Sequence, residues 1–435
     1  MRDTGALQPL IDDALADTPP GRGVWVALSG GLDSSLLLTL AAAACRRHPR
    51  PLHALHVHHG LQAAADDFER HCRRLASRLG VPLWIERVDV DPSAGQGCEA
   101  AAREARYAAF ARRLAPGETL WLAQHADDQA ETLLLAALRG SGVRGLAGMP
   151  AGRDGRGHRL ARPLLGASRA TLEAEARRCG LAWVEDPTNA DESLDRNFLR
   201  HRVLPLLETR WTAAHRSLAR SAALAGEADG LLDELAALDL ERLGDDPARL
   251  PVAGLSALSA PRRRLLIRHA CQCLGLATPP ARRLASLLDQ LDARADSEVR
   301  VAWPGAEARV WRSHLYLLTP VEEGASDDGR GGWLLECPVA WDGQTPLATS
   351  LGEWDVTLRR DDGAAVSLRV APRGGGERLR LAGRGRRDLK RLLQELDVPP
   401  WERGRLLVVH HGEEAVAVLA PSDDWRLVAE GWSVA

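Results

Sequence analysis

The stretch VWVALSGGLDSS, residues 24–35, decides the fold of this chain. An apolar, β-branched run enters a Ser-Gly-Gly turn, and a Leu- and Ala-rich segment follows, which predicts a strand, a tight loop and a helix capped by Asp33 or Ser34. Glycines let the backbone approach a ligand closely, and amide groups at a helix N-terminus attract anions. The residues predicted to bind phosphate are Ser29, Gly30, Gly31, Leu32, Asp33 and Ser34.

The kind of phosphate site follows from what the loop lacks. Lys390 is the only lysine in the chain, so the Gly-Lys-Ser/Thr of a Walker loop is absent. Leu-Asp-Ser stands where a dinucleotide fingerprint has its third glycine. The loop resembles the Ser-Gly-Gly-x-Asp-Ser loop of the PP-loop ATP pyrophosphatase superfamily, whose members cleave ATP between its α and β phosphates and transfer AMP to an oxygen. An ordinary glycine-rich turn is the alternative.

Length and composition narrow the class of protein. A chain of 435 residues is too long for one core, and 45% hydrophobic with 26% charged residues is typical of a globular protein. We find no apolar stretch that could span a bilayer and no signal-peptide pattern, which predicts a cytoplasmic protein. Seven cysteines without a Cys-x-x-Cys suggest neither zinc nor iron–sulfur chemistry. Because the net charge is −3, any nucleic acid must be bound by local basic patches.

Strand-like and helix-like segments alternate over the first part of the chain, which predicts an α/β fold with a doubly wound parallel sheet. A helical middle domain and a small α+β C-terminal domain are expected to follow. The expected strands after the first are 52–60, 81–90 and 119–125, and the expected helices are 1–20, 32–47, 65–79, 100–114 and 168–179. The predicted domains are residues 1–210, 211–320 and 333–435, the last after a linker at 321–332. The middle domain is expected to contain a hairpin at 299–318 and two sets of core leucines at helical spacing, Leu224, Leu231, Leu235 and Leu238, and Leu284, Leu287, Leu288 and Leu291. The last domain is expected to contain one helix at 388–396.

Histidines stand where strands are expected to end. Ligands of parallel sheets lie beyond the carboxyl ends of the strands, so His58, His59 and His125 are expected near a substrate cleft. We expect His58 to contribute to the adenine or ribose site of ATP. A metal site is the alternative, although neighbouring strand residues point to opposite faces.

An acidic helix start follows His125. Asp128 and Glu131 are three residues apart and share one helix face. They are suited to hold Mg²⁺, which prefers oxygen ligands, or to bind a cationic substrate. A helix with an acidic first turn is the plain alternative.

Several ordered motifs together resemble the tRNA(Ile)-lysidine synthetase family. They are distributed over nearly the whole chain, which makes the resemblance specific. The motifs are HVHHGL at 56–61, EAAAREARY at 99–107, HADDQAET at 125–132, LRGSGVRGLAGM at 138–149, RPLL at 162–165, WVEDPTN at 183–189, RNFLR at 196–200, LKRLLQE at 389–395 and VPPWER at 398–403.

The resemblance implies a ligase that forms a C–N bond. ATP adenylates the C2 carbonyl oxygen of the wobble cytidine in the CAU anticodon of an isoleucine tRNA, and the amine of free lysine then attacks C2 and expels AMP. It implies Asp33 and Asp128 as Mg²⁺ ligands, and Asp128 and Glu131, whose roles are exchangeable, as the lysine site. The residues it implies as catalytic are Asp33, Arg103, Arg106, His125 and Asp128.

The predicted tRNA contacts are mostly arginines. Segment 140–157 is rich in Gly and Arg and is expected to be a mobile loop that takes the anticodon. Basic residues beside Trp401 suit an RNA backbone. Surface salt bridges, a plain loop and an arginine-rich solvated face are the alternatives. The predicted contacts are Arg139, Arg144, Arg196, Asn197, Arg200, Arg386, Arg387, Lys390 and Arg403.

Two other functions remain as alternatives. Another PP-loop enzyme, such as a tRNA thiolase or an amide-forming synthetase, would be expected to show paired cysteines or an amidotransferase domain. A nucleotide- or RNA-binding protein without activity would leave Asp128 and Glu131 without a role. The sequence leaves open the oligomeric state, a homodimer included, the base that deprotonates lysine, and the rejection of methionine tRNA.

Overall fold

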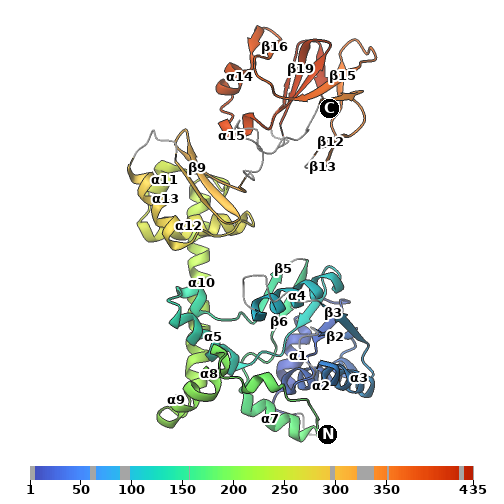
Figure 1. Ribbon diagram of the computed structural model, residues 1–435, viewed down its shortest axis with the longest axis vertical. Coiled ribbons are helices and arrows are strands. Elements are labelled where there is room, and N and C mark those ends of the chain that lie inside the picture. The colour runs from blue at the N-terminus through green and yellow to red at the C-terminus, as the bar shows by residue number, and fades with distance from the viewer. Residues whose placement is uncertain are drawn as a thin grey trace. The chain divides into compact units, whose positions relative to one another are not determined.

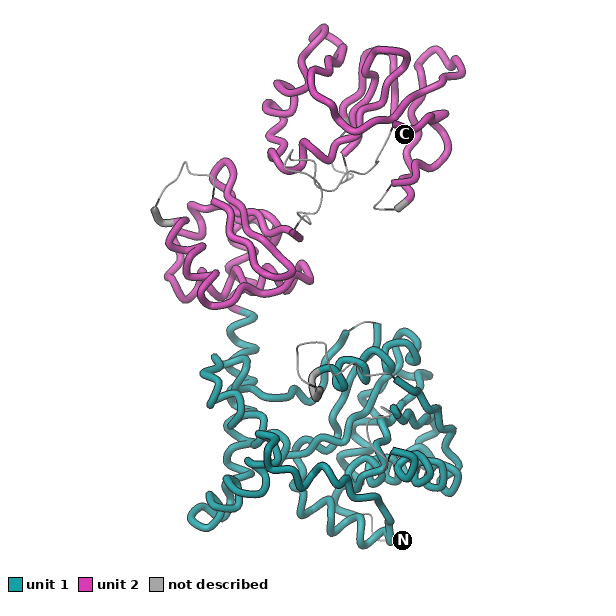
Figure 2. Tube along the Cα trace, in the orientation of Figure 1, with its two compact units in different colours: residues 1–234 teal, residues 235–435 magenta. Residues whose placement is uncertain are grey.

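The computed structural model describes residues 5–58, 65–88, 98–155, 157–293, 299–320, 338–349, 352–420 and 426–434. The chain divides into two compact units, residues 1–234 and 235–435 (Figure 2). The predicted boundaries of three domains stay a prediction, and the predicted linker 321–332 and His59 lie outside the described residues. Over the part that is described, no helix has the length and apolarity to cross a bilayer.

Unit 1 is built on a six-stranded sheet in which only the edge strand β5 is antiparallel (Figure 1). The predicted doubly wound parallel sheet is thereby confirmed. The fourth strand is shorter than expected, because the chain leaves the sheet after Trp121 to begin the next helix. The strands, in spatial order, are β3 (Leu83–Arg87), β2 (Leu52–His58), β1 (Val24–Ala27), β4 (Thr119–Trp121), β6 (His158–Ala161) and β5 (Gly152–Gly155).

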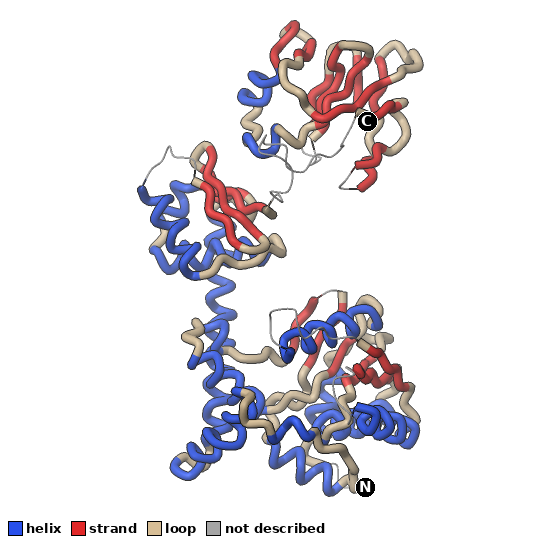
Figure 3. Tube along the Cα trace, viewed as in Figure 1, coloured by secondary structure: helices blue, strands red, loops and turns tan. Residues whose placement is uncertain are grey.

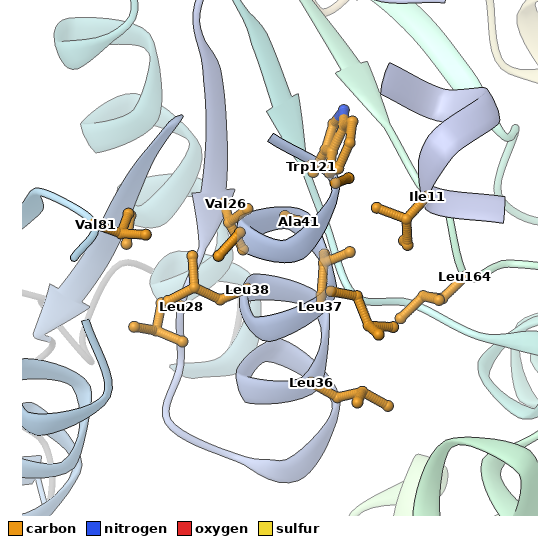
Figure 4. Packing of buried hydrophobic residues seen from close by; sticks show 14 of the residues in the cluster. Ile11, Val26, Leu28, Leu36, Leu37, Leu38, Ala41, Val81, Trp121 and Leu164 are labelled. Carbon is orange, nitrogen blue, oxygen red and sulfur yellow. The ribbon is translucent and has the colours of Figure 1, made fainter. Parts of the chain in front are cut away.

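Helices cover both faces of this sheet. One face packs into a large apolar cluster to which Ile11, Leu37 and Trp121 contribute, each fully buried (Figure 4). The other face packs around Phe110. Burial of each such side chain contributes about 1.5–3 kcal/mol, so the sheet edge that carries the site is firmly held. The helices are α1 (Gln8–Ala16), α2 (Leu32–Arg47), α3 (Ala65–Leu79) and α7 (Arg169–Arg178) on the first face, and α4 (Cys98–Arg113) on the second.

The remainder of unit 1 is largely helical. The prediction of a mobile loop over 140–157 is wrong for two parts of that segment, because α6 and the edge strand β5 lie within it. These helices are α5 (Ala126–Leu138), α6 (Val143–Leu146), α8 (Asp195–Phe198), α9 (Leu204–Arg210) and the first part of α10 (Ala214–Arg242), with a 3-10 turn at Pro187–Ala190 and a π turn at Leu199–Val203.

Unit 2 begins with a helical part that carries a small sheet. The expected hairpin at 299–318 is a three-stranded antiparallel meander, β8 (Arg300–Trp303), β9 (Ala306–Trp311) and β10 (His314–Leu318), and β7 (Arg249–Pro251) pairs with β10. Helices α11 (Val252–Ala257), α12 (Ala260–Cys273) and α13 (Ala281–Ala293) share its core.

The two predicted sets of core leucines have different outcomes. Leu284, Leu287, Leu288 and Leu291 of α13 are buried as expected. In the set on α10, Leu235 is half-buried, but Leu224, Leu231 and Leu238 are 53%, 66% and 50% exposed, so the prediction that these three are core residues is wrong. The buried side of α10 is formed by Ala222, Ala236, Asp239 and Leu240. A helical spacing of leucines shows that they share a face, but not that this face is covered.

The end of unit 2 is a mixed sheet with short helices (Figure 3). The predicted helix at 388–396 is α14 (Leu389–Glu395), and the side chain of Asp388 caps it. Helix α15 spans Pro400–Arg403. The strands are β11 (Val339–Trp341), β15 (Leu368–Pro372), β18 (Leu407–His411), β19 (Glu414–Leu419), β16 (Arg378–Leu381), β17 (Gly385–Asp388) and β20 (Arg426–Val428), with the pairs β12 (Leu347–Thr349)–β13 (Gly352–Trp354) and β14 (Leu358–Arg360)–β21 (Trp432–Val434) beside them.

Candidate active site

The loop between β1 and α2 is organised by one serine hydroxyl. Ser34 Oγ accepts hydrogen bonds from the backbone amides of Ser29 and Gly30, at 3.1 and 3.2 Å, and lies 2.9 Å from Ser29 Oγ. The expectation that Asp33 or Ser34 caps α2 is wrong, because Gly31 is the N-cap and receives no side-chain cap. Ser34 instead bonds to amides that precede the helix, which fixes the shape of the loop before any anion arrives.

Gly30 is the position in this loop where glycine is required. Its φ is +94°, in the left-handed region. A Cβ added there would lie 3.1 Å from Phe68 Cδ1 and 3.2 Å from Cys72 Sγ, both on α3. Gly31 has φ −73°, and its Cβ would meet only Ser29 Oγ, at 3.6 Å. The two glycines therefore have different roles.

A cavity of about 1390 Å³ opens at the carboxyl ends of β1, β2 and β4. Its apolar wall includes Leu55, Val57 and Phe110, and a strap of residues 183–190 forms another wall. The amide of Val184 donates to the carbonyl of Gly30 at 3.1 Å, which ties the strap to the phosphate loop. The predicted site residues that line the cavity are Ser29, Gly31, Leu32, Asp33, Ser34, His58, Arg106, His125, Asp128, Glu131 and Arg200.

His125 lies at the centre of the acidic side of this cavity. It is the N-cap of α5, is 3% exposed, and its amide donates to Asp128 Oδ2 at 3.1 Å. His125 Nε2 lies 3.5 Å from Asp128 Oδ2 and 3.9 Å from Asp33 Oδ2, and Nδ1 lies 3.5 Å from Asp127 Oδ2. Burial alone would lower the pKa of His125, but the three carboxylates outweigh burial and raise this pKa, which favours the imidazolium. The imidazole of His125 is thus surrounded by the carboxylates of Asp33, Asp127 and Asp128.

Asp127 connects three elements. Its Oδ2 accepts the backbone amide of Arg169 at 2.8 Å, and its Oδ1 lies 3.6 Å from His215 Nε2 on α10. Burial acts to raise the pKa of Asp127, but the contact with His125, the Arg169 amide and the charge of His215 lower it to about 2. Asp127 is therefore an anion throughout the physiological range.

Asp33 has a cation of its own. Arg169 Nη1 donates to Oδ1 and Oδ2 of Asp33 at 3.1 and 2.8 Å. Burial raises the pKa of Asp33, and the charges of His125 and Arg169 act against that rise. The carboxylate predicted to hold Mg²⁺ is thus already paired with an arginine.

Glu131 is enclosed by arginines. Its side chain is 1% exposed, and Arg200 donates to both carboxylate oxygens, Nε to Oε1 at 2.7 Å and Nη2 to Oε2 at 3.1 Å. The same Nη2 donates to Asp128 Oδ1 at 3.2 Å, so Arg200 joins the two predicted lysine-binding acids. Arg196 Nε lies 3.3 Å from Glu131, and its Nη2 donates to Thr132. Burial raises the pKa of Glu131, and Arg200 acts against that rise.

The histidines of β2 divide into two roles. His56 Nδ1 donates to the carbonyl of Leu28 at 2.8 Å, which supports the start of the phosphate loop. His58 lines the cavity and contacts Asp66 at 3.3 Å. Among the described residues, no group of three or more His, Cys, Asp or Glu side chains is arranged to hold a metal ion.

The two arginines of α4 differ in position. Arg106 lines the cavity, whereas Arg103 lies 5.1 Å from the ring centre of Tyr107, over which Arg153 also lies, at 5.6 Å. The structure therefore brings Arg106, and not Arg103, to the cavity wall.

The predicted tRNA contacts of unit 1 are mostly engaged within the protein. Arg144 pairs with Asp229 at 2.9 Å and with Asp233, which holds α6 against α10. The amide of Asn197 donates to the carbonyls of Thr188 and Asp191, at 2.8 and 2.9 Å, and so braces the strap. Arg139 is exposed at the end of α5.

The predicted contacts of unit 2 gather near β17 and α14. Arg386 pairs with Glu414, and Arg387 Nε donates to the carbonyl of Arg384. Lys390 is exposed. Arg403 is half-buried, and its Nε donates to the carbonyl of Val398 at 2.8 Å, so part of its role is structural.

Sequence reasoning missed Arg169, Asp127, His215 and Gln129. Gln129 bonds with both the amide and the carbonyl of Met149, at 2.7 and 2.8 Å, and anchors the segment after α6. Asp127 and Gln129 lie inside the quoted motif HADDQAET, so the motif itself was a signal for them. Arg169 lies well apart in sequence from its partner Asp33, and His215 from Asp127; local patterns carry no signal for such pairs.

Three family models match successive parts of the chain. A model described as PP-loop domain matches residues 6–207. A TilS substrate binding domain matches residues 250–316, and a TilS substrate C-terminal domain matches residues 368–421.

Curated relatives match over nearly the full length. A tRNA(Ile)-lysidine synthase of Alkalilimnicola ehrlichii is 44% identical over 428 residues, which cover 96% of this chain and 94% of that protein. The tRNA(Ile)-lysidine synthase of Pseudomonas fluorescens is 43% identical and covers 98% of this chain and 96% of its own. That of Xanthomonas axonopodis pv. citri is 45% identical, with 93% and 90% covered.

Proposed function

The chain belongs to the tRNA(Ile)-lysidine synthase family, and we propose that it forms lysidine on tRNA(Ile) from ATP and free lysine. It is an ATP-dependent ligase that forms a C–N bond. The observation that carries the proposal for this chain is the cavity that the Ser29–Ser34 loop lines together with His125, Asp128 and Glu131.

The proposed reaction has two steps. The C2 carbonyl oxygen of the wobble cytidine in the CAU anticodon attacks the α-phosphorus of ATP, and pyrophosphate leaves. The amine of lysine, after losing its ammonium proton, then attacks C2; AMP leaves with the oxygen that C2 carried, and the attached nitrogen gives up one further proton to water. The new C–N bond replaces the C2–O bond, and no oxidant or reductant is required.

The phosphate loop suits the first step. Ser34 fixes the shape of the loop through the amides of Ser29 and Gly30, and the loop leads directly into the N-terminus of α2, where anions are favoured. The three carboxylates around His125 raise its pKa, and an imidazolium at this position would stabilise negative charge that develops on the adenylate.

The donor set fits Mg²⁺. Asp33 and Asp128 both lie within 4 Å of the same imidazole nitrogen and supply oxygen ligands, and Mg²⁺ is commonly held by one or two carboxylates together with substrate phosphates. When bound, Mg²⁺ neutralises charge on the phosphates.

We infer that Asp128 contacts the lysine amine and that Glu131 positions Arg200. Asp128 is 18% exposed and faces the cavity, whereas Glu131 is 1% exposed and already accepts two bonds from Arg200. A substrate cation reaches the more exposed acid at a smaller cost in desolvation.

The test is pyrophosphate release by the purified protein with Mg²⁺, ATP, lysine and tRNA(Ile) bearing CAU, each omitted in turn. Release that requires the tRNA, with radiolabelled lysine joined to it, supports the proposal. Release without lysine incorporation would overturn the choice of nucleophile, and no release under any condition would overturn the activity. Asp128→Asn is expected to abolish lysine incorporation, with Asp67→Asn on the exposed face of α3 as control.

A further inference from the structure

Arg169 is the first residue of α7 and bonds to the site in two ways. Its backbone amide is fixed on Asp127, and its Nη1 bonds both oxygens of Asp33. Its Nε lies 3.2 Å from Glu173 one turn along the same helix. Arg169 lines the cavity that the phosphate loop also lines. Nothing in the sequence motifs singles this residue out.

Arg169 and the divalent cation that accompanies ATP compete for the carboxylate oxygens of Asp33. Asp33 stands in the first turn of α2, directly after the phosphate loop, and is a proposed ligand of the cation that accompanies ATP. The oxygens that this cation needs already accept bonds from Arg169. Carboxylate lone pairs that accept bonds from an arginine nitrogen cannot also bind a divalent cation at full strength. One cation must move when the other arrives.

Arg169 is the cation that can leave its partner at low cost. Its side chain is 38% exposed, and those of Asp33 and Glu173 are 26% and 35% exposed. Water can therefore solvate all three groups after separation. Arg200, by contrast, would leave the fully enclosed Glu131 without its main counter-ion, which is far more costly. Glu173 also gives Arg169 a second partner on its own helix.

We propose that Arg169 is the resident counter-ion of Asp33 in the free enzyme, and that on nucleotide binding it yields Asp33 to the divalent cation and donates to the polyphosphate that leaves as pyrophosphate. This inference rests on the proposed function for its substrate. Guanidinium groups bind phosphate oxygens with strong charge-assisted bonds, and the released arginine remains beside the loop that holds them. In the free enzyme the carboxylate of Asp33 is thus paired with a cation of the chain itself.

The test compares two affinities of the full-length protein that this exchange moves in opposite directions. The variants are Arg169→Gln, Arg169→Lys and, as matched control, Arg177→Gln, which removes an exposed arginine that also pairs with Glu173. The probes are Mn²⁺ alone, followed by its electron paramagnetic resonance signal, and α,β-methylene-ATP with Mg²⁺, followed by calorimetry. Neither probe requires turnover.

For Arg169→Gln we expect Mn²⁺ alone to bind about tenfold more tightly, because Asp33 is freed, and the nucleotide analogue to bind about tenfold more weakly, because a phosphate donor is lost. Arg169→Lys should retain most of the analogue affinity, and Arg177→Gln should change neither affinity. Adding Asp33→Asn to Arg169→Gln should abolish the gain in Mn²⁺ affinity. Affinities that fall together, or that both stay unchanged, in Arg169→Gln would overturn the exchange, and Arg169→Lys gives the same decision if the glutamine variant folds poorly.

These readouts separate this inference from the proposed function. Opposed shifts without any tRNA-dependent pyrophosphate release would refute the ligase activity and retain the exchange. Lysine incorporation by the wild type without opposed shifts would retain the activity and refute the exchange.

Discussion

At the scale of single residues, the contacts of the Asp127 carboxylate contribute to the free energy of unfolding. It contacts His125, the amide of Arg169 and His215, which lie on or beside three different helices. Because its pKa falls from 3.8 to about 2 on folding, its ionised form stabilises the fold by about 2 kcal/mol. This contribution is present above pH 3.8 and is lost as the pH falls through about 2.

Asp127→Asn is therefore expected to lower the free energy of unfolding by about 2 kcal/mol at pH 5–6. The difference from wild type should shrink in acid, where Asp127 is protonated. The difference should also shrink at high pH, because the pairing of Asp127 with His125 stabilises the fold only while His125 is protonated. This part is complete below 6.5, the pKa of an unperturbed histidine, and is lost as the pH rises through the raised pKa of His125. Urea unfolding across pH 2.5–9 measures this.

Asp67→Asn is the control for this experiment, since Asp67 forms an exposed pair with Arg70, worth less than about 0.5 kcal/mol. A difference between Asp127→Asn and wild type that does not vary with pH would contradict the electrostatic account.

At the scale of elements, the phosphate loop provides a matched pair of glycines. Gly30→Ala places a side chain at φ +94° and against Phe68 and Cys72, so we expect a loss of about 1–3 kcal/mol of stability and weaker ATP binding. Gly31→Ala has an ordinary φ and open space, and should change stability by less than about 0.5 kcal/mol. Thermal unfolding and nucleotide titration of both variants measure this, and equal destabilisation by the two would show that the loop has another conformation.

Helix α6 gives a second prediction at this scale. Arg144 was predicted to contact tRNA, yet it pairs with two aspartates of α10. Arg144→Ala is expected to speed amide hydrogen exchange in residues 143–149, because α6 has only four residues and depends on this tie.

Arg139→Ala is the control for Arg144→Ala, since Arg139 is exposed and lies outside this pair. A loss of tRNA affinity in Arg144→Ala without faster exchange would favour the predicted RNA contact over the structural role.

At the scale of the whole molecule, the predicted RNA contacts of unit 2 can be tested through their charge. Arg387 and Lys390 are exposed, and neither forms an ion pair among the described contacts. If both contact phosphates, Arg387→Gln with Lys390→Gln should reduce the slope of log affinity for tRNA against log salt by about 2. ATP binding in unit 1 should stay unchanged. An unchanged salt slope would show that this surface does not contact the RNA.

Much of unit 1 followed from the sequence. Alternating strands and helices, a glycine loop after the first strand and acids after the fourth are local patterns, and the register of a parallel sheet brings its strand ends to one edge. That geometry suffices to predict that Asp33, His125 and Asp128 lie close together, as they do. The ordered family motifs then indicated which reaction the site performs.

Only the tertiary structure decided how these charges are paired. Arg169 meets Asp33 across 136 positions and Arg200 meets Glu131 across 69, so no local pattern reports either pair. The same holds for exposure: Leu224, Leu231 and Leu238 of α10 share the spacing of core residues and yet face outward. Spacing along a chain fixes which side chains share a face, because backbone geometry is local. What covers that face is fixed by packing between distant segments.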